Sequence, residues 1–119
     1  MKISEISKLL DAQILTGEDA SDREITSACC SDMMSDVLAY VKDQGMLLTG
    51  LVNSQVIRTA NMMDMHCIVF VRSKNPTEEM LELAQECGIV VMRSSLRAYV
   101  ACGKLWMAGL TQDTEDCDV

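Results

Sequence analysis

Polar turns follow three apolar runs of the chain, and their side chains could bind an anion. The turn residues are Gly50, Asn53, Arg72, Ser73, Lys74, Arg93, Ser94 and Ser95. The three bases carry positive charge, and the serines and the asparagine donate hydrogen bonds. Each turn precedes a helical stretch, and the amino end of a helix attracts anions. The pattern predicts a site for a phosphorylated small molecule, a nucleotide or a carboxylate.

A structural interpretation of the same turns is also open. Serine and asparagine are common helix caps, so Asn53, Ser94 and Ser95 would then only end helices. The bases Arg72, Lys74 and Arg93 would only keep this part of the surface soluble.

Catalytic sets and metal-ligand patterns are missing from the sequence. The single histidine, His66, begins an apolar run, where a structural role is expected. Neither a P-loop nor a G-x-G-x-x-G loop is present. The cysteines show no C-x-x-C spacing, so we expect structural thiols, with Cys117 exposed, and no metal site or cofactor. The cysteines are Cys29, Cys30, Cys67, Cys87, Cys102 and Cys117. The sequence favours a non-catalytic protein, and a small enzyme is the less favoured alternative.

Strand patterns alternate with helical patterns along the chain. The expected strands are residues 12–16, 25–30, 46–50, 67–71 and 89–92. Such alternation indicates βαβ units, so we predict a three-layer α/β fold: a mostly parallel sheet of four or five strands with helices on both faces. Ligands of such sheets bind beyond the carboxyl ends of the strands. The three polar turns should therefore share one edge.

Cap residues predict where the helices begin and end. Ser31-Asp32, Asn53 and one of Ser94 and Ser95 are expected to cap helices. Asn75 is expected at the N-cap before Pro76. Gly88 should end the same helix in a left-handed conformation.

Composition and charge limit the partners. The net charge of −8 repels nucleic-acid phosphate and anionic lipid, so neither is an expected partner. No stretch is long and apolar enough for a membrane span, and the first residues do not resemble a signal peptide, so a cytoplasmic location is expected. One domain, residues 1–110, should precede an acidic mobile tail, residues 111–119. The segment Met62-Met63-Asp64-Met65 either packs against the sheet or faces a protein partner.

Motifs spread over residues 3–108 resemble the DRTGG domain family. They are Ile3-Ser4-Glu5-Ile6 with Leu9-Leu10, Arg23-Glu24-Ile25, Met34-Ser35-Asp36-Val37-Leu38, Leu47-Leu48-Thr49-Gly50, residues 76–84 and Gly88-Ile89-Val90-Val91. The layout is also similar to the amino-terminal domain of HPr kinase/phosphorylase and, more distantly, to the uridine-binding domain of Mur ligases. The chain departs from the family after two strands. Gly50-Leu51-Val52 stands in place of Gly-Asp-Arg, and Arg72-Ser73-Lys74 in place of Thr-Gly-Gly.

The resemblance implies a regulatory or interaction module and not an enzyme. The resemblance also implies self-association as a homodimer. Because such domains usually accompany other modules, docking onto a separate protein partner is a further expectation. The likeness to HPr kinase/phosphorylase implies no kinase chemistry, because the phosphate-binding loop of that enzyme lies in another domain. The alternative function is a phosphate- or nucleotide-binding sensor that uses the carboxyl edge of the sheet.

Overall fold

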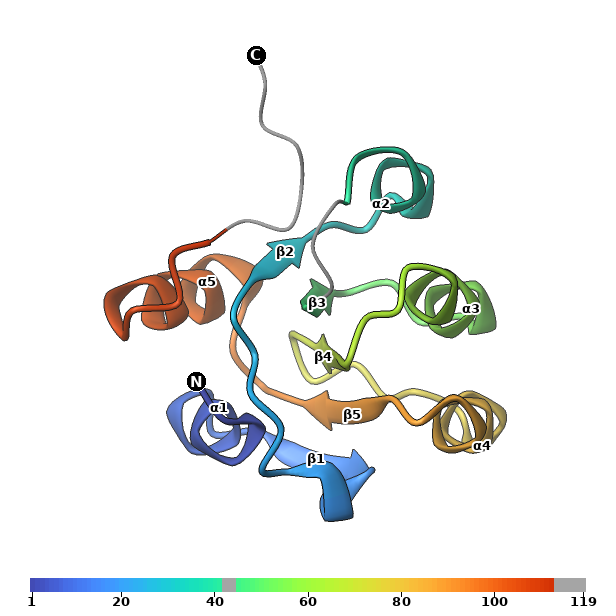
Figure 1. The fold of residues 1–119 in the computed structure, drawn as a ribbon, viewed down its shortest axis with the longest axis horizontal. Coiled ribbons are helices and arrows are strands. Elements are labelled where there is room, and N and C mark those ends of the chain that lie inside the picture. The colour runs from blue at the N-terminus through green and yellow to red at the C-terminus, as the bar shows by residue number, and fades with distance from the viewer. Residues whose placement is uncertain (42–44, 113–119) are drawn as a thin grey trace.

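A five-stranded sheet forms the middle of the computed structural model, which describes residues 1–41 and 45–112 (Figure 1). The strands are β1 (Gln13–Thr16), β2 (Ala28–Cys30), β3 (Met46–Thr49), β4 (Cys67–Phe70) and β5 (Val90–Arg93). Their order across the sheet is β1-β5-β4-β3-β2. Strands β2 to β5 are parallel, and β1 pairs antiparallel with β5. The predicted fold class, a mostly parallel sheet in an α/β domain, is confirmed.

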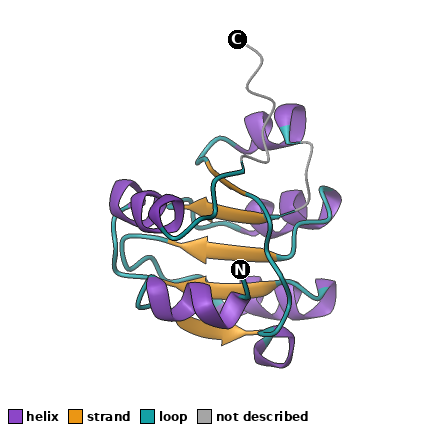
Figure 2. Cartoon of the chain, turned by 60° about the vertical axis from the view of Figure 1, so that its left-hand side comes forward, coloured by secondary structure: helices purple, strands orange, loops and turns teal. Residues whose placement is uncertain are grey.

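Helices cover both faces of this sheet (Figures 1 and 2). On one face lie α2 (Met34–Tyr40), α3 (Ser54–Met62) and α4 (Glu78–Cys87), and on the other lie α1 (Ile3–Leu9) and α5 (Ala98–Met107). A short 3₁₀ turn, η1 (Glu18–Ala20), follows β1. Successive parallel strands from β2 to β5 always add on the same side, and right-handed crossovers then place their helices on one face. The chain after β5 instead crosses to the opposite face, and α5 returns toward β2.

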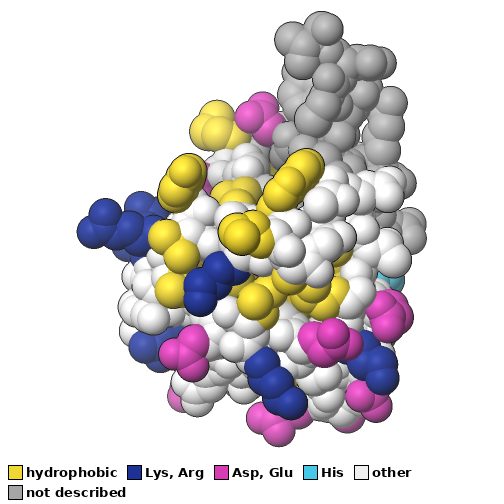
Figure 3. Space-filling view, turned by 90° about the vertical axis from the view of Figure 1, so that its left-hand side faces the viewer, with side chains coloured by type: hydrophobic (Ala, Val, Ile, Leu, Met, Phe, Trp, Pro, Cys, Tyr) yellow, Lys and Arg dark blue, Asp and Glu magenta, His cyan; other side chains and the backbone are white. Residues whose placement is uncertain are grey.

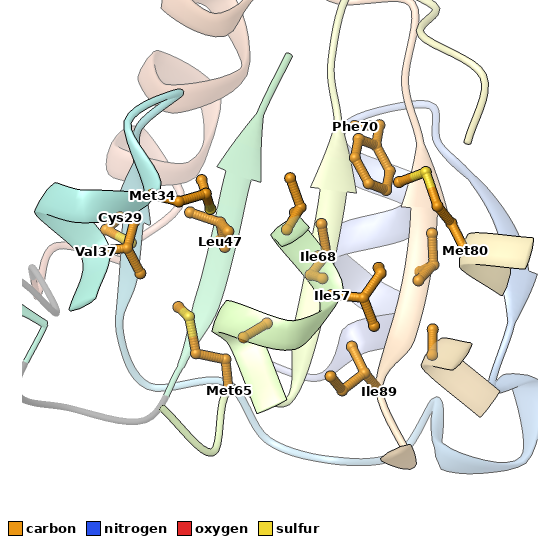
Figure 4. Packing of buried hydrophobic residues seen from close by; sticks show 14 of the residues in the cluster. Cys29, Met34, Val37, Leu47, Ile57, Met65, Ile68, Phe70, Met80 and Ile89 are labelled. Atoms are coloured by element: carbon orange, nitrogen blue, oxygen red, sulfur yellow. The ribbon is translucent and has the colours of Figure 1, made fainter. Parts of the chain in front are cut away.

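Alternating strand residues fill two cores. Leu47, Ile68 and Val91 face α2, α3 and α4, where they meet Ile57 and Met80 (Figure 4). Their neighbours Met46, Leu48, Cys67, Val69, Val90 and Met92 face α1 and α5. Both faces of the central strands are buried, as expected for a parallel sheet covered by helices. Methionine side chains occupy positions in both cores, so the methionine-rich composition is largely explained by packing.

Two of the predicted helix ends are confirmed. The Asn53 side chain accepts a hydrogen bond from the N–H of Gln55 at 2.9 Å and caps α3. Gly88 ends α4 with a φ of 72°, in the left-handed region. A side chain would be strained there, which explains the glycine.

Three predicted caps are wrong. Helix α4 begins after Thr77, whose Oγ1 accepts the N–H of Met80 at 3.2 Å, so Asn75 is not its cap. Helix α5 begins after Arg97, and neither Ser94 nor Ser95 caps it. Helix α2 begins after Met33, and Asp32 bonds elsewhere. The helices start one to three residues later than predicted. Before α2 and α5, Ser31 and Ser94 instead accept the N–H groups of Met33 and Leu96 in turns of their own.

The methionine-rich segment divides between core and surface. Met65 is buried in the core, while Met62 is 68% exposed at the end of α3. No helix in the described part of the chain is long and apolar enough to cross a membrane. Of the predicted tail, Thr111 and Gln112 are described, and the Gln112 carbonyl accepts the N–H of Ala28 at 3.0 Å. Residues 113–119, including Cys117, lie outside the described residues.

Candidate functional site

The turns after the parallel strands meet at one edge of the sheet. Thr49 pairs in register with Phe70, and Phe70 with Arg93, so β3, β4 and β5 end at the same level. The predicted common edge is therefore confirmed. Strand β2 is parallel to β3 and ends beside it, which adds the segment Ser31-Asp32 as a fourth turn (Figure 2).

Asp32 connects three of these turns. Its Oδ1 accepts the hydroxyl of Thr49 at 2.9 Å and the backbone N–H of Gly50 at 2.8 Å. Its Oδ2 lies 3.8 Å from a guanidinium nitrogen of Arg72. The Gly50 N–H lowers the pKa of Asp32 most, burial opposes it, and the Thr49 hydroxyl and the Arg72 charge lower the pKa further. The carboxylate is therefore ionised at neutral pH and holds the turn after β3.

Arg72 and Ser73 both adopt the left-handed backbone conformation, with φ of 59° and 55°. Non-glycine residues rarely do so, and such conformations persist where the surroundings fix them. Here the N–H of Arg72 donates to the Leu96 carbonyl at 2.8 Å, and the N–H of Ser73 to the Ser94 carbonyl at 2.9 Å. These bonds hold the crossing segment, residues 94–97, against the turn after β4.

The absence of a side chain at Gly50 leaves room for the guanidinium of Arg72. A Cβ at Gly50 would collide with the guanidinium of Arg72. The missing side chain therefore lets the guanidinium lie directly over the turn after β3, within reach of Asp32. A glycine at this point serves close approach and not an unusual backbone angle.

Two adjoining hollows at this edge share Arg72 and Arg97, and we call them together the carboxyl-edge cleft. One, of about 440 Å³, is lined by Cys30, Ser31, Asp32, Gly50, Val71, Arg72, Arg97, Ala98 and Tyr99. The other, of about 500 Å³, is lined by Arg72, Ser73, Ser95 and Arg97. Both are open to solvent, and together they contain two guanidinium groups and one carboxylate. The cleft is thus locally basic on a chain of net charge −8.

The amino end of α5 opens into the same cleft. Ala98 and Tyr99, its first two residues, line the hollow, and no side chain caps the helix. Its first turn contains no acidic residue. Uncapped N–H groups and the positive end of the helix dipole favour an anion at this position.

The structure brings together four of the eight residues predicted for a ligand site. Gly50, Arg72, Ser73 and Ser95 line the carboxyl-edge cleft. The other four, Asn53, Lys74, Arg93 and Ser94, are not among the residues that line it. Asn53 caps α3, and Lys74 is exposed beyond the turn.

The side chains of Ser94 and Arg93 do not line the cleft, because successive side chains of a strand point to opposite faces of the sheet. Ser94 is buried, and its Oγ donates to the Leu10 carbonyl at 2.8 Å while accepting the N–H of Leu96 at 3.2 Å. Arg93 follows Met92, which faces α1 and α5, so alternation directs its side chain toward the α2–α4 face.

Asp32 and Arg97 were missed by sequence reasoning. The signal for Asp32 was present, since Ser31-Asp32 follows a strand pattern just as the other turns do. The signal for Arg97 was its place directly before a helix. Its position at the cleft depends on the path of residues 94–97, which the sequence pattern does not define.

His66 lies at the opposite edge, at the amino end of β4, and its side chain is half-buried. Burial, followed by the charge of Arg23, lowers its pKa. The histidine is therefore neutral at physiological pH and remote from the carboxyl-edge cleft. Among the described residues, no group of three or more His, Cys, Asp or Glu side chains could hold a metal ion.

Comparison with known proteins gives a family match and similar solved structures. The DRTGG domain family model matches residues 5–105. A crystal structure of the CBS and DRTGG domains from the regulatory region of a Clostridium perfringens pyrophosphatase, complexed with its activator diadenosine tetraphosphate, has a similar fold, with a TM-score of 0.75 and 14% identity. It aligns with 99% of this chain, which spans about half of that structure (52%). No curated protein matched. The predicted likeness to HPr kinase/phosphorylase was not among these findings and stays a prediction.

Proposed function

Because the chain belongs to the DRTGG domain family, we propose that it is a non-catalytic regulatory module that senses a nucleotide or another phosphorylated small molecule. The carboxyl-edge cleft is the proposed binding site, and the cytoplasm is the proposed location. The related pyrophosphatase region, which contains CBS and DRTGG domains, binds a dinucleotide activator, and this supports a ligand of the same chemical class.

One observation carries this proposal: two arginines and an uncapped helix start face the same open cleft. Arg72 and Arg97 can each bind phosphate oxygens with two parallel N–H groups. The first N–H groups of α5 add donors that an anion can satisfy without displacing a side-chain cap. Ser73 and Ser95 add hydroxyl groups at the rim. Tyr99, at the wall of the hollow that also contains Asp32 and Gly50, offers an aromatic surface for a base.

Asp32 gives the site a way to respond to its ligand. Its contact with Arg72 is long, at 3.8 Å, and both side chains are exposed, so this ion pair is weak. A phosphate group can therefore take over the Arg72 guanidinium while Asp32 keeps its bonds to Thr49 and Gly50. The turn after β4 would then change partners on ligand binding, and the turn after β3 would not.

A thermal-shift screen with nucleotides, dinucleotides, sugar phosphates and inorganic phosphate tests the proposal. We expect at least one phosphorylated compound to raise the unfolding temperature of the full chain, and the Arg72→Ala/Arg97→Ala variant to lose that shift. The matched control is Lys74→Ala/Arg93→Ala, which removes the same charge from the same edge but leaves the cleft intact. Equal loss in both variants would show only nonspecific charge attraction, and an unchanged shift in the first would place the site elsewhere.

Self-association is the second part of the proposed function, and the outer side of α5 supports it. Tyr99, Trp106 and Met107 are 91%, 63% and 90% exposed, and Val100 is also exposed. Figure 3 shows hydrophobic side chains gathered on this face, with charged side chains around them. Apolar groups concentrated in this way are typical of protein interaction surfaces. A second copy of the chain is the proposed partner, and a separate protein is the alternative.

Sedimentation velocity at micromolar concentration tests this second part. We expect a dimer for the parent chain and a monomer for Trp106→Glu/Met107→Glu. The control is Met62→Glu, which places the same charge on an exposed methionine of α3, on the other side of the sheet. A parent chain that stays monomeric would refute self-association and leave the ligand site untouched.

A further inference from the structure

A separate hollow of about 260 Å³ lies between β2 and α5, and two thiols meet at its wall. Cys30, at the end of β2, is exposed, and Cys102, in α5, is half-buried. Both carry free thiols. The remaining lining is mainly apolar and includes Leu48, Leu105 and Trp106.

Cys30 and Cys102 line the same hollow, and the interaction of their side chains makes the two thiols unequal. A hydrogen bond from the S–H of Cys30 favours a thiolate on Cys102 and lowers the pKa of Cys102 to about 7. The interaction with Cys102, together with burial and the nearby charge of Asp32, raises the pKa of Cys30. An ordinary cysteine has a pKa of about 8.5 and is mostly a thiol at neutral pH. The negative charge of Asp32 disfavours a thiolate on Cys30 and is not among the groups that act on Cys102, so we take Cys102 as the nucleophile of the pair.

Burial distinguishes this pair from its neighbours. Cys29 points into the α2–α4 core, as expected from strand alternation, and Cys67 is fully buried. Burial also raises the pKa of Cys67 beyond its ordinary range. Cys87 is half-buried at the end of α4, away from this hollow. Thiol reactivity should therefore concentrate at Cys102.

We propose that Cys30 and Cys102 form a thiol–disulfide exchange site that accepts a small-molecule disulfide of the oxidised glutathione type. The Cys102 thiolate attacks one sulfur of the disulfide, forms a mixed disulfide and releases one small thiolate. The Cys30 thiol, after losing its proton to solvent or to that thiolate, attacks the Cys102 sulfur and releases the second. The two protein thiols are oxidised to a Cys30–Cys102 disulfide, and the small disulfide is reduced to two thiols. A small thiol in excess reverses both steps.

The proposed disulfide would join the end of β2 to the middle of α5. Cys30 also lines the carboxyl-edge cleft, so oxidation would change one wall of that cleft. Cytosolic disulfides, where they form, are usually transient and sense the redox state. The exchange site does not depend on the proposed ligand, since neither thiol is needed to hold a phosphate.

The test uses the full chain in mixtures of reduced and oxidised glutathione, followed by acid quenching, alkylation and peptide mass spectrometry. We expect a reversible Cys30–Cys102 linkage in the parent chain, in Cys87→Ser and in Cys117→Ser. In Cys30→Ala, we expect glutathione to remain trapped on Cys102. A linkage that requires Cys117, or glutathione on Cys87 before any Cys30–Cys102 linkage forms, would overturn the proposal.

Alkylation rates give a second readout that does not require the disulfide to close. At pH 7, iodoacetamide should modify Cys102 faster in the parent chain than in Cys30→Ala, by about tenfold, because loss of the hydrogen bond returns its pKa toward the ordinary value. Circular dichroism confirms that the variant is folded. Equal rates in the two folded proteins would contradict the proposed activation of Cys102 by Cys30.

Discussion

Two residues at the carboxyl-edge cleft, Arg72 and Ser73, have unfavourable backbone conformations that hydrogen bonds to neighbouring residues stabilise. Arg72 and Ser73 keep left-handed backbones because the crossing segment accepts their N–H groups. Ser73 stands where the family has the first glycine of Thr-Gly-Gly, so the chain has a side chain at a left-handed position that glycine would occupy without strain. Arg72 stands in place of the threonine, and its guanidinium reaches both Gly50 and Asp32.

Substitution of Ser73 by glycine should therefore stabilise the protein. Relief of the left-handed strain contributes about 1 kcal/mol, partly offset by the greater freedom of glycine in the unfolded chain. Lys74→Gly is the matched control: its backbone is not left-handed, so it should destabilise by roughly 0.5–1 kcal/mol. Urea denaturation measures both changes. A loss of stability for Ser73→Gly as large as that of the control would contradict the assigned strain.

Asp32 should make the free energy of unfolding depend on pH in the acidic range. Its pKa is lowered in the folded state, so its contribution is complete above the unfolded pKa of about 3.9 and is lost as pH falls through the lower folded pKa. Asp32→Asn should thus lose less stability than the parent between pH 5 and pH 2.5. Parallel curves for the parent and Asp32→Asn would show that the carboxylate bonds contribute nothing.

At the scale of elements, hydrophobic periodicity predicted the strands and helices well, because both faces of the central strands are buried and α3 and α4 each have one apolar side. Strand β2 is shorter than the predicted 25–30, since only Ala28–Cys30 pairs with β3. The helix starts were less predictable. A cap depends on where the turn before it makes its own hydrogen bonds, and Asn75 and Thr77 are equally suitable by residue type.

The assignment of the α4 cap can be checked by comparing these two residues. Thr77→Ala removes the acceptor for the N–H of Met80 and should cost about 1 kcal/mol of stability. Asn75→Ala removes an exposed side chain outside the helix and should change stability by less than about 0.5 kcal/mol. Thermal or urea unfolding distinguishes the two, and the reverse order would restore Asn75 as the cap.

At the scale of the whole molecule, the site depends on topology. The parallel order of β2 to β5 places four turns at one edge, and the sequence predicted three of them. The path of the crossing segment then brings Arg97 and the first residues of α5 to the same hollow as Asp32 and Gly50. Residue type alone could not predict that the side chain of Arg72 lines the cleft while those of Arg93 and Ser94 do not. Their side chains are directed by strand alternation at the last residues of β5, where a shift of one position reverses every assignment.

The same crossing segment places α5 beside β2. As a result, the basic cleft, the thiol pair and the exposed apolar surface all include residues of α5. One end of α5 contributes to the basic cleft, its middle supplies Cys102, and its outer side carries the exposed Trp106 and Met107. A ligand, a thiol oxidant and a second copy of the chain would therefore all act on one helix. We infer that α5 is the element through which such signals would be combined.

The affinity for a phosphorylated ligand, measured by isothermal titration calorimetry, tests whether the carboxyl-edge cleft is the ligand site. Each charge-assisted contact of an arginine with phosphate contributes roughly 1.5–3 kcal/mol, so Arg72→Ala/Arg97→Ala should weaken binding by about 100-fold or more. Lys74→Ala/Arg93→Ala should stay within about threefold of the parent, because an exposed charge outside the cleft contributes little. If the first variant binds as tightly as the second, the carboxyl-edge cleft is not the ligand site.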